Sequence, residues 1–168
     1  MSIDVSIDPT KYRQVLGHFP TGVTVITGMQ GDEPVGFTIG SFSSVSLDPP
    51  LVGFLPQVTS ERWPAIEASG SFCVNVLGAH QGELCWRFAR TGLDHQFEGI
   101  GWSQSPITGS PVLDGVIAWM DCTIYKVVEA GDHWFVMGEI KEFAHLHPDE
   151  DPLPLLFYRG KLGGFLPR

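Results

Sequence analysis

The sequence predicts a mainly β protein that folds as one closed antiparallel barrel with a few short helices added. Six or seven segments rich in β-branched and aromatic residues are separated by turns, and only two or three segments show helical periodicity. Most connections are too short for a crossover helix, which favours antiparallel pairing over a parallel α/β sheet. Because a barrel of this size fills its interior with its own side chains, a large cofactor should lie outside it or at a subunit junction, which makes a homodimer attractive.

The composition indicates a single globular domain over residues 1–168. Of the 168 residues, 43% are hydrophobic and 17% are charged, which allows a sizeable core and excludes a disordered or fibrous chain. No apolar run approaches the roughly 20 residues that span a bilayer, and the first residues lack the pattern of a secretory signal. We therefore expect a soluble protein in the cytoplasm.

Charge and the metal-ligating residue types exclude several partners. Nineteen acidic and ten basic residues give a net charge of −9, which argues against binding to nucleic acid or to an anionic membrane surface. Cys73, Cys85 and Cys122 are far apart and lack metal-ligand spacing, so we expect reduced core residues. His145 and His147 lie in a polar, proline-containing segment that is more typical of a solvated loop than of a metal site.

The first elements follow from local patterns. Residues 9–19 carry apolar side chains at helical spacing behind Pro9, which suits a first turn, and they predict a short helix. The β-branched run at 23–27 and a second run that begins at Val35 flank a turn at 30–33. These two runs predict an antiparallel hairpin.

The stretch 35–54 reads as a strand, a hydroxyl-rich loop and a second strand. Residues 40–46 contain four serines, and a rigid turn at 47–50 leads into an apolar run at 51–55. Small hydroxyl groups and Gly40 leave backbone amides open to a ligand with many acceptor oxygens, such as the ribityl phosphate of a flavin. The alternative is a serine-rich connection that binds no ligand.

A possible phosphate site lies at the start of a short helix that we expect at residues 61–69. Thr59 or Ser60 suits the N-cap, and Gly70 suits a C-terminal stop. The first amides and the positive end of the helix dipole would attract a phosphate, and Arg62 adds a charge nearby. The alternative is an ordinary helix cap.

The remaining elements are assigned from the same kinds of pattern. In chain order they are a strand at 72–77, a helix at 81–90, an irregular region at 91–116 with short strand pieces near Ile107 and Val112, two long strands at 117–128 and 133–143 joined by a turn at 129–132, and a final strand at 155–158 before a turn at 159–161.

Six motifs follow one another along the chain: FPTGVTVIT (19–27), VGFTIGSFSSVSLDPPLV (35–52), SGSFCVNVL (69–77), SPVLDG (110–115), AGDHWFVMGEI (130–140) and YRGKLGGF (158–165). In this order and spacing, the chain resembles the short-chain flavin reductase family of FMN-binding split-barrel proteins. The resemblance extends from about Tyr12 to Gly164, nearly the whole chain. Each motif alone is weak, but the combination is specific.

The resemblance implies a mainly β fold of the FMN-binding type, an antiparallel split β-barrel. It also implies a homodimer that binds FMN or FAD in a groove at the subunit junction and reduces it with NADH or NADPH. The reduced flavin would pass to the oxygenase component of a two-component monooxygenase. No basic cluster for a 2′-phosphate is evident, which slightly favours NADH. The alternatives are a flavin-binding carrier or sensor of the same fold and an oxidase that retains its flavin.

The resemblance also implies which residues contact the flavin. Those expected at or near the isoalloxazine edge are Thr38, Ile39, Gly40, Ser41, Ser43 and Ser44, and those expected toward the ribityl chain and phosphate are Pro56, Gln57, Ser60 and Arg62. The family usually has a threonine in place of Arg62. Phe88 and Arg90 match a segment that approaches the flavin in the family, although a core position and the helix dipole would explain them equally well.

His133, in the motif Gly131-Asp132-His133, is the expected catalytic residue. The resemblance places this histidine at the nicotinamide side, where it would orient the nicotinamide or its phosphates through a hydrogen bond. Tyr158 and Arg159 would close the same region. Considered in isolation, His133 reads as a structural or exposed histidine, and Tyr158 and Arg159 as a strand end with a surface arginine.

Overall fold

The computed structural model describes residues 7–90, 92, 95–145 and 152–167. The elements are α1 (Pro9–Leu16), β1 (Thr21–Gly22), β2 (Thr24–Gln30), β3 (Glu33–Ile39), β4 (Ser43–Leu47), β5 (Pro50–Phe54), α2 (Trp63–Ser69), β6 (Ser71–Val76), α3 (Gly82–Ala89), β7 (Trp102–Gln104), β8 (Pro111–Leu113), β9 (Ala118–Ala130), β10 (His133–His145), β11 (Leu155–Tyr158) and β12 (Lys161–Gly164). No helix in these described ranges is long and apolar enough to cross a membrane.

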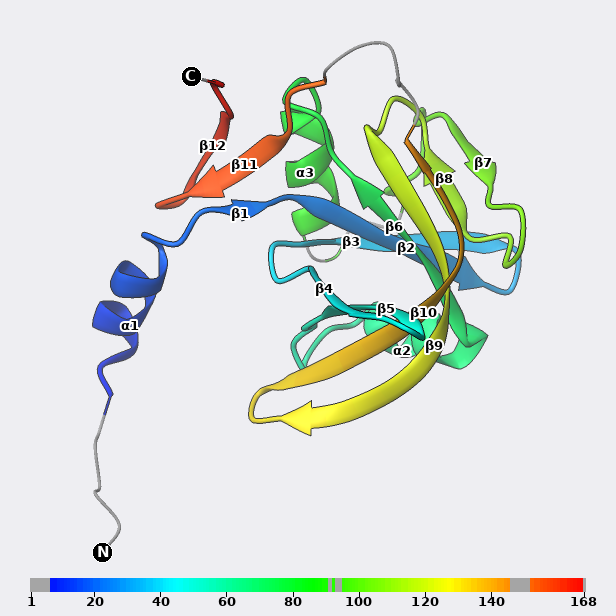
Figure 1. The fold of residues 1–168 in the computed structure, drawn as a ribbon, viewed down its shortest axis with the longest axis horizontal. Helices are drawn as coiled ribbons and strands as arrows, with labels where there is room; N and C mark the ends of the chain where they lie inside the picture. The colour runs from blue at the N-terminus through cyan, green and yellow to red at the C-terminus, as the bar shows by residue number, and fades with distance from the viewer. Residues whose placement is uncertain (1–6, 91, 93–94, 146–151, 168) are drawn as a thin grey trace, which may run out of the picture.

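A curved antiparallel sheet dominates the fold, with the strand order β3-β2-β6-β9-β10-β5-β4 (Figure 1). The expected hairpins β2-β3 and β9-β10 are both present, and the mainly β, antiparallel fold class is confirmed. The expectation of a closed barrel is wrong, because the outermost strands β3 and β4 do not pair with each other. Residues 40–42 carry the chain away from β3, so that β4 pairs with β5 instead.

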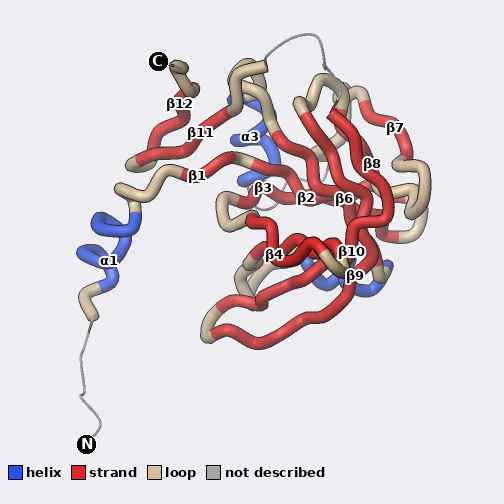
Figure 2. The backbone as a smooth tube through the Cα atoms, in the orientation of Figure 1, coloured by secondary structure: helices blue, strands red, loops and turns tan. Residues whose placement is uncertain are grey.

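A small arm extends from the main sheet. It consists of α1 and the three-stranded sheet β1-β11-β12, and Figure 2 shows α1 apart from the strands of the main sheet. Within the arm, the end of α1 is bonded to the turn between β11 and β12, because the N–H of Arg159 donates to the carbonyl of Gly17 at 3.0 Å. The rings of His18 and Tyr158 also meet edge to face at 6.3 Å. No residue of α1 is buried.

Two clusters of buried side chains form the core. The first cluster packs α2 against the main sheet, where the Phe54 ring meets the rings of Phe72 and Trp63 edge to face. The second cluster packs α3 and residues 95–116 against the sheet and includes Cys73 and Phe88. Neighbouring strand residues belong to different clusters, because successive side chains point to opposite faces of a sheet.

The three cysteines lie in these clusters as free, buried thiols, so the expectation of reduced core residues is confirmed. Burial is the largest cause that raises the pKa of the Cys73 and Cys122 thiols, and the Asp121 carboxylate raises both further. His147 lies outside the described residues. Among the residues that are described, no three His, Cys, Asp or Glu side chains form a group that could hold a metal ion.

The serine-rich segment is not only a loop. Residues 43–47 form β4, which pairs with β5 with a register shift between Ser44 and Ser46. The reason is the turn at Asp48 and Pro49, because it pairs Leu47 directly with Pro50 and returns the chain along β5. Edge strands tolerate polar side chains, since one edge and often one face meet solvent.

Other boundaries also differ from the expected ones. The short strand piece near Ile107 is absent, and β7 lies at Trp102–Gln104 instead. The backbone amides of Ile107 and Thr108 donate to the buried Asp121 carboxylate rather than to a neighbouring strand. The first helix ends at Leu16 rather than at residue 19, and β12 was not expected.

Candidate functional site

A groove of about 960 Å³ lies where the end of β3, the segment after β5, α3 and the start of β10 meet. This volume is at the upper end of the roughly 300–1,000 Å³ that small-molecule sites occupy. Ten residues expected from the sequence line it, namely Thr38, Ile39, Gly40, Ser41, Pro56, Gln57, Ser60, Arg62, Phe88 and His133. The fold therefore brings together segments that are far apart in the sequence.

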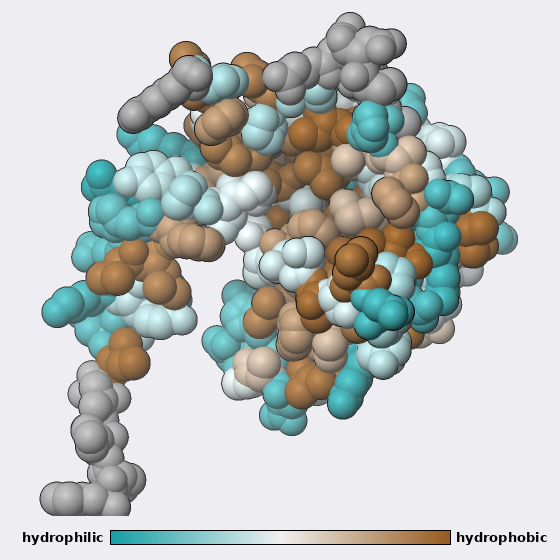
Figure 3. All heavy atoms as spheres, in the orientation of Figure 1, coloured by the Kyte–Doolittle hydropathy of each residue, from teal (hydrophilic) through white to brown (hydrophobic). Residues whose placement is uncertain are grey.

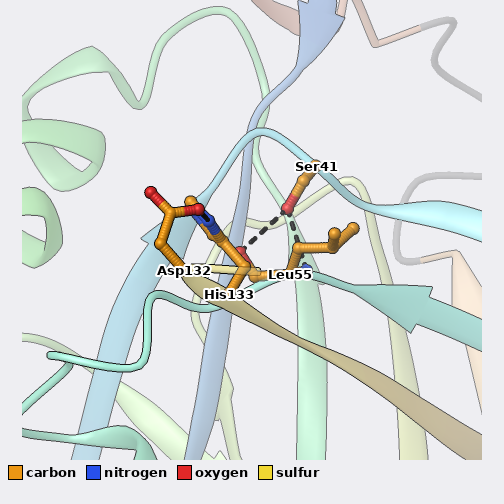
Figure 4. A network of polar contacts seen from close by, with 4 residues as sticks. All are labelled: Ser41, Leu55, Asp132 and His133. Carbon is orange, nitrogen blue, oxygen red and sulfur yellow. Dashed lines mark hydrogen bonds and ion pairs between the residues drawn. The ribbon is translucent and has the colours of Figure 1, made fainter. Parts of the chain in front are cut away.

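The wall at the end of β3 is held in place by hydroxyl groups. The Thr38 hydroxyl donates to the Cys85 carbonyl at 2.7 Å and fastens β3 to α3. The Ser41 hydroxyl oxygen accepts from the Leu55 N–H at 3.0 Å, as Figure 4 shows. A Cβ at Gly40 would lie 3.1 Å from the Thr21 hydroxyl oxygen, so a side chain would crowd this wall. Because the Thr38 and Ser41 hydroxyl groups are already bonded within the protein, mainly the backbone groups of this wall can bond to a ligand.

The wall continues from Ser41 into the segment after β5, which is attached to the start of β10. The Trp134 N–H donates to the Pro56 carbonyl at 2.9 Å, and the Val58 N–H donates to the Asp132 carbonyl at 3.0 Å. Gln57 and His133 form a β-bridge between these two bonds. The backbone therefore fixes the position of His133 relative to Pro56 and Gln57.

The His133 ring is oriented by its neighbour Asp132. The Nδ1–H of His133 donates to Asp132 Oδ1 at 2.7 Å, a bond that Figure 4 marks with a dashed line. This hydrogen bond is the main cause that lowers the pKa of the exposed Asp132 carboxyl. Among the described residues, Nε2 of His133 has no protein partner, so it is the ring nitrogen that can meet a ligand.

Arg62 brings a positive charge to the groove. It is the one Lys or Arg among the described residues that line the groove, and its Nη1 donates to the Arg90 carbonyl at 2.9 Å. This bond ties the start of α2 to the end of α3. Glu61 beside it is the acidic residue of the lining.

The expected phosphate site at a helix start is corrected by the structure. The helix α2 begins at Trp63, two residues later than expected, and has seven residues with Pro64 in its first turn. Ser60 is not the N-cap, although its hydroxyl oxygen accepts from the Trp63 N–H at 3.2 Å. A proline lacks an N–H, and a helix this short has a weak dipole, so the helix start by itself offers few donors.

Two residues of α3 back the groove from the core. Phe88 is 1% exposed and meets the Phe97 ring edge to face at 5.0 Å, so its burial follows from core packing. Contact between Phe88 and a flavin stays a prediction. Cys85 is also buried, and burial raises the pKa of its thiol, so it stays protonated at neutral pH.

Five residues expected from the sequence do not line this groove. Ser43 and Ser44 lie exposed in the edge strand β4, and Arg90 meets Arg62 through its carbonyl. Tyr158 and Arg159 line a second cavity of about 670 Å³ beside β12, rather than the region of His133. In one chain, therefore, these two residues do not close the nicotinamide side.

The groove also has an apolar side that the sequence reasoning missed. Tyr12 and Leu16 of α1, Trp86 of α3 and Phe157 of β11 line it. The local patterns predict a helix and a strand for Tyr12, Leu16 and Phe157 but not a place in the groove, because α1 and β11 meet the groove only through the fold. Trp86 has a signal, since a tryptophan beside the buried Cys85 on an amphipathic helix points away from the core.

The groove suits a flat ring system with a polar edge and an anionic tail. Backbone groups of residues 38–41 and of the segment after β5 offer donors and acceptors to the edge of a ring. Arg62 offers a charge-assisted donor, and the apolar side offers contact area. His133 lies at the groove with its ring orientation set by Asp132. No cluster of acid, base and nucleophile is needed for chemistry that a pair of cofactors supplies.

Comparisons with known proteins agree with this chemistry. The family model of the flavin reductase like domain matches residues 16–165. A flavin reductase of Pseudomonas putida is 48% identical over 161 residues, which cover 95% of this chain and 92% of that protein. The reductase subunit HsaB of a flavin-dependent monooxygenase of Rhodococcus jostii is 47% identical over 162 residues, with coverages of 96% and 80%.

A solved structure has the same fold. The NADH:FAD oxidoreductase SgcE6 of Streptomyces globisporus C-1027, in complex with NAD and FAD fragments, superposes with a TM-score of 0.87. It is 35% identical in sequence, and the match covers 97% of this chain and 98% of that chain.

Proposed function

The chain belongs to the family of flavin reductase like domains, and we propose that the groove is where it brings a nicotinamide and a flavin together. The chain is an NAD(P)H:flavin oxidoreductase that reduces FMN or FAD, with NADH as the hydride donor that its relatives support, and supplies the reduced flavin to a monooxygenase.

The observation that carries the placement is the position of His133 in the groove. Its ring is held by Asp132, its backbone is bridged to Gln57, and it lines the same groove as residues 38–41. We assign residues 38–41 to the polar edge of the flavin ring and Arg62 to the anionic tail. Pro56, Gln57 and Ser60 lie between these two positions along the chain.

A bound flavin and a bound nicotinamide supply the hydride chemistry between them. The protein residues position the two rings and exclude water. Thr38 and Ser41 hold the wall against which the flavin lies, through their bonds to Cys85 and Leu55. Nε2 of His133 donates or accepts one hydrogen bond that orients the nicotinamide, and no proton transfer is required of it.

The active form is proposed to be a homodimer in the cytoplasm. The apolar side chains of α1 are exposed in the single chain, and a second copy would bury them and complete the groove near Leu16 and Phe157. The three free thiols are typical of a reducing compartment. A dimer also explains how Tyr158 and Arg159 could reach a flavin, namely that of the partner subunit.

The test crosses both flavins with both nicotinamides in a steady-state assay of nicotinamide oxidation. We expect turnover of added FMN or FAD with NADH, and less with NADPH. Since a released flavin needs only about micromolar affinity, or about −8 kcal/mol, dialysed protein should be nearly colourless. A protein that stays yellow would indicate a retained flavin, and no consumption of NADH or NADPH with either flavin would overturn the proposal.

A further inference from the structure

Trp86 is an aromatic side chain of the groove that the proposed function does not yet use. It lies on α3 and is 45% exposed, whereas Cys85 and Phe88 on the same helix are buried. Its ring makes no aromatic contact with any described residue. A half-exposed indole in a concave site is available for stacking on a flat ligand.

The residues around Trp86 favour a nucleotide as that ligand. Ala89, one turn further along α3, also lines the groove, and its small side chain leaves room beside the indole. The guanidinium of Arg62 donates to the carbonyl of Arg90, the residue that follows the end of α3, and Arg62 lines the same groove as Trp86. A ring platform and a positive charge in one groove, both at α3 or its end, suit a purine base and the phosphates attached to it.

We propose that Trp86 is the stacking platform for an adenine ring, with the adjoining diphosphate directed toward Arg62. This inference rests on the proposed function and makes it more specific. FAD and NADH both contain an adenine and a diphosphate, whereas FMN contains neither. Trp86 is therefore a specificity-determining residue that favours the dinucleotide substrates of the groove over FMN.

The kinetic test is Trp86→Ala, assayed with FMN and with FAD at varied NADH. Stacking of one base on an aromatic side chain corresponds to about a 5- to 100-fold effect on affinity. If the platform takes the adenine of FAD, the ratio of the KM for FAD to the KM for FMN should rise by this factor. If it takes the adenine of NADH, the KM for NADH should rise by this factor with either flavin.

Two further variants control for a loss of structure. Trp86→Phe retains an aromatic face and should recover most of the lost affinity. Phe143→Ala removes an exposed aromatic side chain that does not line the groove, and it should change none of the three KM values. An equal rise of the KM for FMN and for FAD with no change for NADH, or no change in any KM, would overturn the inference.

A binding measurement separates this inference from the proposed function. ADP, which carries the adenine, its ribose and the diphosphate but neither flavin nor nicotinamide, should quench the tryptophan fluorescence of the wild type, and Trp86→Phe should lose this quenching. This readout needs no turnover, so it can succeed even if the assay shows no flavin reduction. Absence of ADP quenching in a wild-type protein that reduces FAD would reject the platform while leaving the proposed function intact.

Discussion

At the scale of single residues, both the ring orientation and the backbone position of His133 are fixed by hydrogen bonds, which is unusual for a histidine at the surface. One third of its side chain is exposed, its Nδ1 is bound by Asp132, and the backbone bonds on both sides of Gln57 hold it against the groove. Arg62 and Trp86 line the same groove. The chemistry of the site therefore depends on how these few side chains align two bound ring systems, rather than on a charged catalytic group.

The substitution His133→Ala should slow NADH-dependent flavin reduction far more than it weakens flavin binding. Loss of an orienting hydrogen bond leaves the nicotinamide misaligned, and misalignment of about 1 Å can cost roughly 100-fold in rate. Stopped-flow reduction gives the rate, and a flavin titration gives the affinity.

The matched control is His80→Ala, because His80 is exposed and does not line the groove. His133→Gln, whose side-chain amide reaches about the position of Nε2, should recover part of the rate. Equal losses of rate and of flavin affinity in His133→Ala would reject the orienting role.

At the scale of elements, β6 and β9 hold the long excursion at residues 95–116 through two buried polar side chains. Asn75 of β6 donates through Nδ2 to the carbonyls of Val25 and Pro111 and to the Thr27 hydroxyl oxygen, and its Oδ1 accepts from the Leu113 N–H at 2.8 Å. A fully buried amide with all these partners fastens β2, β6 and β8 together.

Asp121 of β9 acts on the same excursion from the next strand. Its carboxylate is fully buried and accepts from the N–H groups of Ile107 and Thr108 and from the Thr108 hydroxyl. These bonds shape the turn before β8. They also explain why residues near Ile107 form no strand, because their amides are already paired with a side chain.

Replacement of Asn75 by leucine should lower the free energy of unfolding by about 2–4 kcal/mol. The change leaves the Leu113 N–H without its buried acceptor, which costs about 1–3 kcal/mol. It also removes the bonds from Nδ2 to the Val25 and Pro111 carbonyls, which contribute about 1 kcal/mol each, although the Pro111 carbonyl keeps its bond from the Thr27 hydroxyl. Urea unfolding followed by circular dichroism measures the loss.

Gln104→Leu on the exposed side of β7 is the matched control and should stay within about 0.5 kcal/mol of the wild type. Equal stability of Asn75→Leu and Gln104→Leu would show that the Asn75 bonds do not stabilise the fold.

At the scale of the whole molecule, the single chain leaves an apolar surface uncovered on its arm. Val15, Leu16 and Phe19 are each more than half exposed, and Figure 3 shows a notch between the α1 arm and the body of the molecule. Burial of one such large side chain contributes about 1.5–3 kcal/mol. A second copy that covers α1 would remove this surface from water and would close the open side of the groove.

The protein should therefore have twice the mass of one chain in multi-angle light scattering. Val15→Glu places a charge on the apolar side of α1 and should raise the dissociation constant of the dimer more than tenfold, because a buried unpaired charge is costly. Gln14→Glu adds the same charge at the neighbouring exposed polar position and should leave the dimer intact. A wild type that remains a monomer at all concentrations tested would contradict the homodimer.

The sequence by itself determined the elements whose signals are local. The hairpins β2-β3 and β9-β10, the helix α3 and the strand β11 follow from β-branched runs, glycine turns and helical spacing. The motifs also indicated residues 38–41, Arg62 and His133, which meet in one groove. The reason is that strand, turn and helix preferences act between residues that are close in the chain.

Only the tertiary structure decided the open sheet, the separation of Tyr158 and Arg159 from His133, and the position of Trp86 in the groove. Each of these depends on contacts between segments that are far apart in the sequence. Asp121 shows the same principle, because its buried carboxylate pairs with amides 13 and 14 residues away and overrides the local strand preference near Ile107. These features are set by long-range pairing of buried polar groups and by packing of the core. No local sequence pattern encodes either of them.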